Sequence, residues 1–196
     1  MKQTIDEILT TIYRFYRSTK TYADLGPDTE ELVAARRQAG SDGPYEQWRA
    51  MLRRLRDRFP GHSVTNRSHH LPTGNLDAGY AGRLSLPPST GEESHSVGFL
   101  VSFLVPCYVV YTSRMIPLGE DQKEDPEYPT RHEIRFTFTA DEEPYVQEIV
   151  REIEATYAGY EPMPPEVGNG LVLDVVTGLN TIGTTKLYHC LFTDDW

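Results

Sequence analysis

The stretch Val97-Gly98-Phe99-Leu100-Val101-Ser102-Phe103-Leu104-Val105 decides the fold. Successive side chains of a strand point to opposite faces, and here bulky apolar side chains occur at both odd-numbered and even-numbered positions. A strand has this pattern when other layers of the protein cover both of its faces, so the sequence predicts a central strand here. Pro106 follows and has no backbone N–H to donate, which predicts a bulge or bend before the strand resumes at residues 107–113.

Later segments are predicted to extend this sheet. Residues 133–138 alternate Glu, Arg and Thr with Ile and Phe, which is the pattern of a half-buried strand. Two apolar runs at 171–177 and 184–193, separated by turn residues, predict two further strands. Residues 72–96 instead hold seven glycines and prolines, which argue against a compact helix or a long strand in that segment.

The first 60 residues have helical periodicity. Three helices are predicted, over residues 4–18, from Asp28 or Thr29 through residue 38, and over residues 45–58. Glycine and proline clusters separate them.

A fourth helix is predicted to start at Asp141, because Pro144 suits the first turn and an apolar stripe follows it. Helices first, then strands with one helix between them, predict an α+β fold with the N-terminal helices packed on a mostly antiparallel sheet. We expect one domain over residues 1–196, with a helical part to residue 60 and a sheet-rich part from residue 61.

Composition narrows the class of protein. The chain has 196 residues, 38% of them hydrophobic and 24% charged, as in ordinary globular proteins. Its net charge of −10 disfavours binding to nucleic acid or to a membrane surface. The first residues carry no apolar leader, and the longest apolar stretch, residues 97–111, is too short to span a bilayer. We therefore expect a cytoplasmic protein without membrane contact.

Sequence signatures of catalysis are missing: the chain has no GxxxxGK[ST], GxSxG, HExxH or CxxC motif. On an expected strand, His189 and Cys190 would point to opposite faces, and Cys107 lies in the most apolar segment, so both thiols are expected to be packing groups. His69 and His70 would also point apart. We expect no metal and no cofactor.

Asp174 interrupts an apolar run, where an unpaired carboxylate would be costly. Three alternatives remain open for it: a solvent-facing position on an edge strand, a buried ion pair with Lys186 or His189, or a catalytic carboxylate.

Acidic residues concentrate in the second part of the chain. Residues 1–60 carry 11 basic and 9 acidic side chains, whereas residues 61–196 carry 8 basic and 20 acidic ones. Such a cluster is either a solvated face or an anionic surface that attracts a basic protein partner. Tyrosine, which outnumbers phenylalanine twelve to seven, is enriched at interfaces. The residues expected to contact a partner are Asp121, Glu124, Asp125, Glu127, Tyr128, Glu148 and Glu152.

The acidic part, residues 97–196, ends in the aromatic–acid tail Leu191-Phe192-Thr193-Asp194-Asp195-Trp196. In size, charge and layout it resembles the bacterial immunity proteins of polymorphic toxin systems. No motif of that group matches residue by residue, so the resemblance assigns no functional positions. It implies a protein that occludes the active site of a toxin, in many cases a basic nuclease, with carboxylates occupying the groove meant for phosphate.

These observations lead to a hypothesis and two alternatives. The first is a non-catalytic cytosolic binding protein, an immunity protein for a basic toxin. The second is a small hydrolase whose site forms where residues 62–95 meet the sheet, using His69, His70, Asp77 or Cys107. The third is a subunit of a stable assembly joined through the N-terminal helices. The sequence leaves the oligomeric state and any small ligand open.

Overall fold

A curved six-stranded sheet organises the computed structural model, which describes residues 4–19, 28–68, 77–88, 91–118, 130–177 and 180–193. Five strands follow one another in chain order and pair antiparallel, while the sixth pairs parallel with the fourth. The strands are β1 (Val64–Asn66), β2 (Gly79–Leu86), β3 (Ser94–Ser102), β4 (Cys107–Pro117), β5 (Thr130–Arg135) and β6 (Glu161–Pro162).

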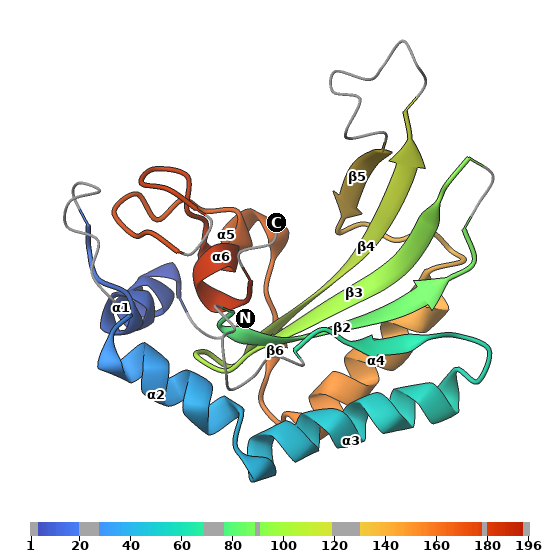
Figure 1. Ribbon diagram of the computed structural model, residues 1–196, viewed down its shortest axis with the longest axis horizontal. Coiled ribbons are helices and arrows are strands. Elements are labelled where there is room, and N and C mark those ends of the chain that lie inside the picture. Colours follow the sequence, from blue (N-terminus) through green and yellow to red (C-terminus); the bar gives the residue numbers. More distant parts are fainter. Residues whose placement is uncertain are drawn as a thin grey trace.

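Helices precede the sheet and interrupt its later part, which confirms the predicted α+β class (Figure 1). Thr4 caps the first helix in a reciprocal arrangement with Glu7, and Thr29 caps the second by accepting from the Leu32 N–H. The helices are α1 (Ile5–Phe15), α2 (Glu30–Ala39), α3 (Asp42–Arg58), α4 (Glu143–Thr156), α5 (Pro165–Gly168) and α6 (Leu187–Leu191).

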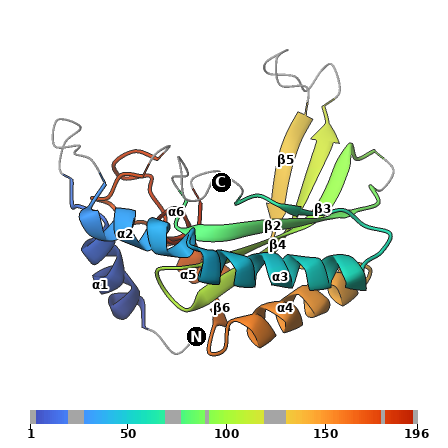
Figure 2. The ribbon, with the colours of Figure 1, turned by 60° about the horizontal axis from the view of Figure 1, so that its bottom comes forward.

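One face of the sheet is covered by α3 and α4, which lie side by side beneath it (Figures 1 and 2). Trp48 of α3 is fully buried there and stacks on Tyr80 of β2, with ring centroids 5.3 Å apart. Phe99 of β3 and Ile149 of α4 complete the same apolar cluster. This layer buries the odd-numbered side of β3, as expected for a central strand.

The opposite face is covered only in part. The helix α1 and the C-terminal segment with α5 and α6 pack over one end of the strands, where Leu100 and Val109 meet Tyr188 and Phe192 (Figure 1). Toward the other end, β4 and β5 curve away from the helices, and no described helix covers this face of the sheet (Figure 2). The fold therefore leaves an open, concave sheet surface.

A buried ion cluster fixes the start of α4 against the sheet. The carboxylate of Glu142 has a side chain only 1% exposed and accepts from Arg114 of β4 at 2.7 Å, from Arg135 of β5 at 3.1 Å, and from the Thr139 N–H at 2.8 Å. His95 of β3 donates to the same carboxylate at 2.8 Å. Three neighbouring strands are thereby tied to one helix end.

The prediction against a long strand at residues 72–96 was wrong. The strand β2 occupies Gly79–Leu86 and pairs with β3 along its whole length, from Gly79 opposite Ser102 to Leu86 opposite His95. At Gly82 the ring of Phe99 on the neighbouring strand fills the space that a side chain would occupy, and at Gly79 the backbone of Val101 and Phe192 does so. Pro106 lies in the bend at residues 103–106 that joins β3 to β4, which confirms the bend predicted before the strand resumes at Cys107.

The two predicted C-terminal strands were wrong as well. Residues 171–177 contribute a single bridge, between Leu171 and Lys186, and then turn. Residues 187–191 form the short helix α6 instead of a strand. All five α6 residues are buried, and a short element buried on every side has the same continuous apolar pattern whether it is helix or strand.

Candidate binding site on the open sheet face

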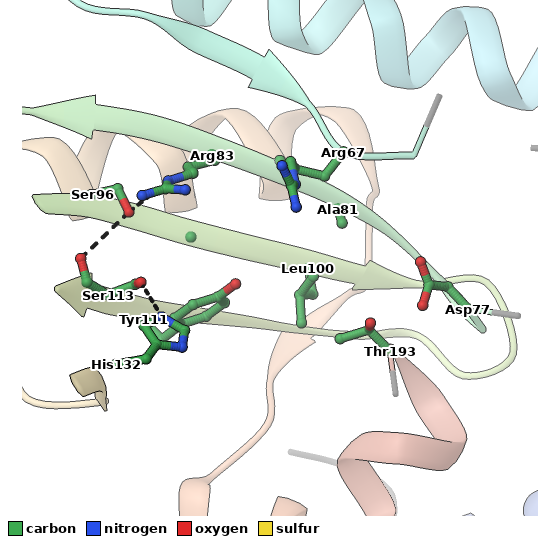
Figure 3. Close-up of a pocket in the computed structure, with 12 residues that line it drawn as sticks. Arg67, Asp77, Ala81, Arg83, Ser96, Leu100, Tyr111, Ser113, His132 and Thr193 are labelled. Carbon is green, nitrogen blue, oxygen red and sulfur yellow. Dashed lines mark hydrogen bonds between the residues drawn. The ribbon is translucent and has the colours of Figure 1, made fainter. Parts of the chain in front are cut away.

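A hollow of about 170 Å³ lies on the open face of the sheet (Figure 3). Strands β2, β3 and β4 form its floor, with Arg67, which follows β1, on one side and β5 on the other. Its wall is mostly polar and contains arginine, histidine, tyrosine and serine side chains. The residues that line the hollow are Arg67, Asp77, Ala81, Gly82, Arg83, Ser96, Gly98, Leu100, Tyr111, Ser113, His132 and Thr193.

Strand register brings these residues together from distant parts of the chain. Arg83 of β2 lies opposite Gly98 of β3, and Gly98 in turn lies opposite Tyr111 of β4. Directly opposite residues on an antiparallel pair project from the same face of the sheet. The Arg67 N–H donates to the Ala81 carbonyl at 2.8 Å, which continues the β1–β2 pairing by one step and aligns Arg67 with the hollow.

Gly98 allows the floor of the hollow to be shallow and flat. A Cβ atom at this position would overlap the ring of Tyr111, with its Cζ and hydroxyl ends closest. The Tyr111 ring therefore lies across the strand, over the place where any other residue would project a side chain (Figure 3). A glycine inside a central strand weakens its packing, and here the missing side chain makes room for an aromatic wall of the hollow.

The positive charge of the hollow stands out in an acidic protein. Within the described ranges, Arg67 makes no hydrogen bond or ion pair through its guanidinium group, and Arg83 donates only its Nε, to Ser96 Oγ at 2.9 Å. Elsewhere most arginines of α3 pair with glutamates, as Arg54 does with Glu152, and Arg114 of β4 pairs with Glu92. Two guanidinium groups that have no carboxylate partner in the described part of the chain thus line one concave surface.

Between Arg83 and β5, the edge of the hollow is formed by serine hydroxyl groups and a histidine imidazole. Ser113 Oγ and His132 Nε2 are 2.6 Å apart, a hydrogen bond that joins β4 to β5 across the side of the hollow (Figure 3). Ser96 Oγ, which accepts from Arg83, lies 3.5 Å from the Ser113 carbonyl oxygen. Arginine, serine and histidine side chains therefore form one continuous polar edge.

The other end of the hollow has a different character. Asp77 and Thr193 lie there, beyond Ala81 and Leu100 as seen from Arg83, whereas Arg67 lies beside Ala81 (Figure 3). The hollow is therefore polarised along its length, with Arg83 at one end, Arg67 beside a short apolar floor in the middle and a carboxylate at the other end. A bound anion would be attracted to the first end and repelled from the last.

Two of the predicted partner-binding residues have partners inside the fold. Glu148 of α4 accepts from Arg58 of α3 at 3.1 Å and also pairs with Arg151, and these hydrogen bonds lower the pKa of its carboxyl group. Glu152 accepts from Arg54 of α3 at 2.8 Å. Their positions on α4 thus have a structural explanation that the sequence did not supply, because both carboxylates link α4 to α3.

The other predicted partner-binding residues lie outside the described residues, so their role stays a prediction. They form part of the acidic segment between β4 and β5, and they are Asp121, Glu124, Asp125, Glu127 and Tyr128.

The residues of the hydrolase hypothesis do not gather at one place among those that are described. Asp77 lines the hollow, which lies where that hypothesis expected a site. Cys107 is fully buried in the apolar cluster beneath the C-terminal segment, and burial raises its thiol pKa. His69 and His70 lie outside the described residues.

Asp174 lies on a turn, rather than on an edge strand or beside Lys186 or His189. Its carboxylate accepts from Tyr13 Oη at 2.7 Å and from Ser18 Oγ at 2.5 Å, and these two hydrogen bonds lower its pKa.

His189 uses Nδ1 to accept from the Lys186 N–H, and burial lowers its pKa to about 4. Because residues 187–191 are helical, the strand argument for His189 and Cys190 does not apply.

Most residues of the hollow escaped the sequence analysis. Arg83, Tyr111 and Ser113 are single polar residues within strands, and nothing in their local sequence separates them from other exposed strand positions. One signal was present: Gly98 interrupts the most apolar strand of the chain, and a glycine there indicates a close approach by another group.

Comparisons of this chain with protein-family models, with curated proteins and with solved structures found no match. In the part of the chain that the structure describes, no helix has both the length and the apolar character to cross a bilayer. Across the same residues, no three His, Cys, Asp or Glu side chains converge as metal ligands would.

Proposed function

We propose that this chain is a non-catalytic binding protein that takes its ligand in the hollow on the open sheet face. The observation that carries the proposal is the pair Arg67 and Arg83, whose guanidinium groups face a concave surface without a carboxylate partner among the described residues. Concave surfaces with a few convergent polar groups are where proteins bind ligands most often. Rigid strands on all sides of the hollow favour a preformed site.

A screen by nuclear magnetic resonance tests this proposal. Small anionic, neutral and cationic compounds are added to labelled protein, and the backbone amide shifts of Ala81, Gly98 and Ser113 are followed. At least one compound class should shift these amides in the wild type and in Ser85→Leu, but not in Ala81→Leu. Ala81 lines the hollow, whereas Ser85 lies on the same face of β2 outside it.

Because Ala81 is buried, lost binding in Ala81→Leu does not distinguish a blocked hollow from a misfolded protein, and a second variant makes that distinction. Arg83→Gln keeps the size of the side chain close to the original and removes its charge. Shifts that map to another surface, or that persist unchanged in both hollow variants, would remove the support for the site.

The contact between Ser113 and His132 favours a second candidate function, a hydrolase. A serine hydroxyl 2.6 Å from an imidazole nitrogen has the spacing of a nucleophile and its general base. Against it, no carboxylate of the described chain orients the other nitrogen of His132, and Ser113 is 7% exposed. A fluorophosphonate probe decides: a hydrolase should label at Ser113 in wild type and not in His132→Ala, whereas a binding protein should not label.

The immunity hypothesis belongs to the same class of function and keeps its own prediction. Its acidic segment would bind a basic protein and leave the hollow for another ligand. Replacing Asp121, Glu124 and Asp125 with Asn, Gln and Asn should then abolish binding of a basic partner without altering the response of the hollow to small compounds.

A further inference from the structure

The chemistry of the hollow also indicates the class of its ligand. We infer that the hollow is a seat for a phosphate monoester group, held between Arg67 and Arg83 beside Ser113 and His132; this rests on the proposed binding function of the same site. The inference follows from the number of donors, their directions, the size of the hollow and its polarity.

The hollow offers more charged hydrogen-bond donors than a singly charged ligand group needs. Among the described residues, Arg83 donates only its Nε, so its two terminal nitrogens have no acceptor there, and the Arg67 guanidinium has none either. Arginine presents its N–H groups as a planar fork that matches two oxygens of a phosphate. Two such forks balance the charge of about −2 that a phosphate monoester carries near neutral pH.

The donors also come from different directions. Arg67 follows β1, Arg83 belongs to β2, and His132 projects from β5 on the far side of the Tyr111 ring (Figure 3). A planar carboxylate offers two oxygens in one plane, whereas a phosphate monoester offers three terminal oxygens arranged as a tripod. Donors around a concave floor suit the second geometry better than the first.

The hollow has room for more than the phosphate itself. Its volume of about 170 Å³ equals the liquid volume of about five or six water molecules, at roughly 30 Å³ each. The apolar floor at Ala81 and Leu100 lies next to the arginine end, where the carbon part of an ester would extend. Asp77 at the far end repels a second anion, so the phosphate is directed to one end only.

Phenyl phosphate and phenyl sulfate are the probes that test this inference, because they share a shape and differ in charge. Both are titrated at fixed ionic strength into wild-type protein and into two single variants, with amide shifts as the readout. The test variant is Arg83→Gln. The control is Arg37→Gln, which removes the same charge from an exposed position on α2 that is not part of the hollow.

Phenyl phosphate should bind saturably, shift the amides of Gly98 and Ser113, and bind more tightly than phenyl sulfate. Loss of a charge-assisted hydrogen bond should weaken binding to Arg83→Gln by at least about tenfold. Binding to Arg37→Gln should match the wild type. The inference is overturned if phenyl phosphate shows no saturable shift, or if both variants weaken binding equally, which would indicate only a response to net charge.

Failure of this inference differs from failure of the binding function. If phenyl phosphate does not bind but another compound shifts the amides of the hollow in wild type and not in Ala81→Leu, the phosphate inference is wrong and the binding function stands. If no compound does so, both are wrong.

The source of the phosphate is a separate arm of the same titration. Free phosphoserine is compared with a short peptide that contains phosphoserine, and either result requires the phosphate seat. Equal affinities indicate a small phosphorylated compound as the ligand, whereas tighter binding of the peptide indicates a phosphorylated protein partner that extends over the open sheet.

Discussion

The His95 imidazole donates to the Glu142 carboxylate across 2.8 Å, and both side chains are buried between the sheet and the start of α4. This contact joins residues 47 positions apart in the chain. Arg114 reaches the same carboxylate and also pairs with Glu92 at 2.6 Å. The cluster therefore connects the end of the sheet near the hollow to the helix on the opposite face.

Glu142→Gln should destabilise the protein by about 3 kcal/mol, because it leaves buried cationic groups without their shared partner. The free energy of unfolding in urea measures the effect. Glu143→Gln serves as the control, since Glu143 is the exposed next residue and should change stability by less than about 0.5 kcal/mol. Equal losses for the two variants would show that the cluster contributes nothing beyond helix propensity.

Stability should also fall in acid as Glu142 is protonated. Burial raises the pKa of this carboxyl group, but hydrogen bonds from Thr139, Arg114 and His95 outweigh that effect and lower it from 4.5 to about 2. A group with a lower pKa in the folded state stabilises the fold above its unfolded pKa, and the contribution is lost as pH falls toward the folded value. Unfolding free energy should therefore decline between pH 4.5 and about 2.

Glu142→Gln carries no titrating carboxyl at this position, so its decline with acid over the same range should be shallower than that of wild type. Parallel pH profiles for the two proteins would contradict the assignment of this acid dependence to Glu142.

The main features of the sheet could be predicted from local sequence. A central strand was correctly predicted near residues 97–105 from apolar side chains on both faces, although β3 spans Ser94–Ser102 and residues 103–105 belong to the bend that follows it. Alternation at residues 133–138 predicted a strand that overlaps β5 (Thr130–Arg135) only in its first half, and Pro144 predicted the start of α4 to within two residues. Each of these elements could be predicted because the pattern that identifies it lies within a few consecutive residues.

The errors lay where long-range packing overrides local preference. Gly82 argued against a strand, yet the Phe99 ring from the next strand fills the space that a side chain would need, so glycine is required there. The buried segment 187–191 gave an apolar run that does not distinguish helix from strand.

The hollow was beyond local reasoning for the same reason. Arg83, Gly98 and Tyr111 meet through the pairing of β2 with β3 and of β3 with β4, and pairing across strands has no signature within a single strand. Glu148 and Glu152 show the reverse case. Their spacing along α4 suggested an external partner, whereas Arg58 and Arg54, which bind them, lie 90 and 98 residues earlier in the chain, on α3.

Asp174 should contribute to stability by joining α1 to the C-terminal segment. Asp174→Asn replaces a charged acceptor of two hydrogen bonds, from Tyr13 and Ser18, and should cost about 1 kcal/mol because the site is partly exposed. The free energies of unfolding of Asp174→Asn, Tyr13→Phe and the double variant together give the coupling energy between Tyr13 and Asp174. Additive losses would mean that the Tyr13–Asp174 hydrogen bond has no energetic role.

The α3–α4 ion pairs should contribute little, and their contribution should depend on salt. Glu148 and Glu152 are partly exposed, so replacing both with Gln should lower stability by less than about 1 kcal/mol in low salt. The difference from wild type should shrink as added salt screens the charges. Urea unfolding at low and high salt measures it. A salt-independent loss would indicate packing of the side chains rather than their charge.

Gly98→Ala should reshape the hollow while leaving the fold intact. The new methyl group would overlap the outer end of the Tyr111 ring, and that ring can move because it is a side chain at an open face. We expect an unfolding free energy lower by about 1 kcal/mol, shifted Tyr111 ring resonances and weaker binding of phenyl phosphate. Gly43→Ala is the matched control, since nothing lies within 4 Å of a Cβ there. Unchanged Tyr111 resonances in Gly98→Ala would show that the ring does not need the glycine floor.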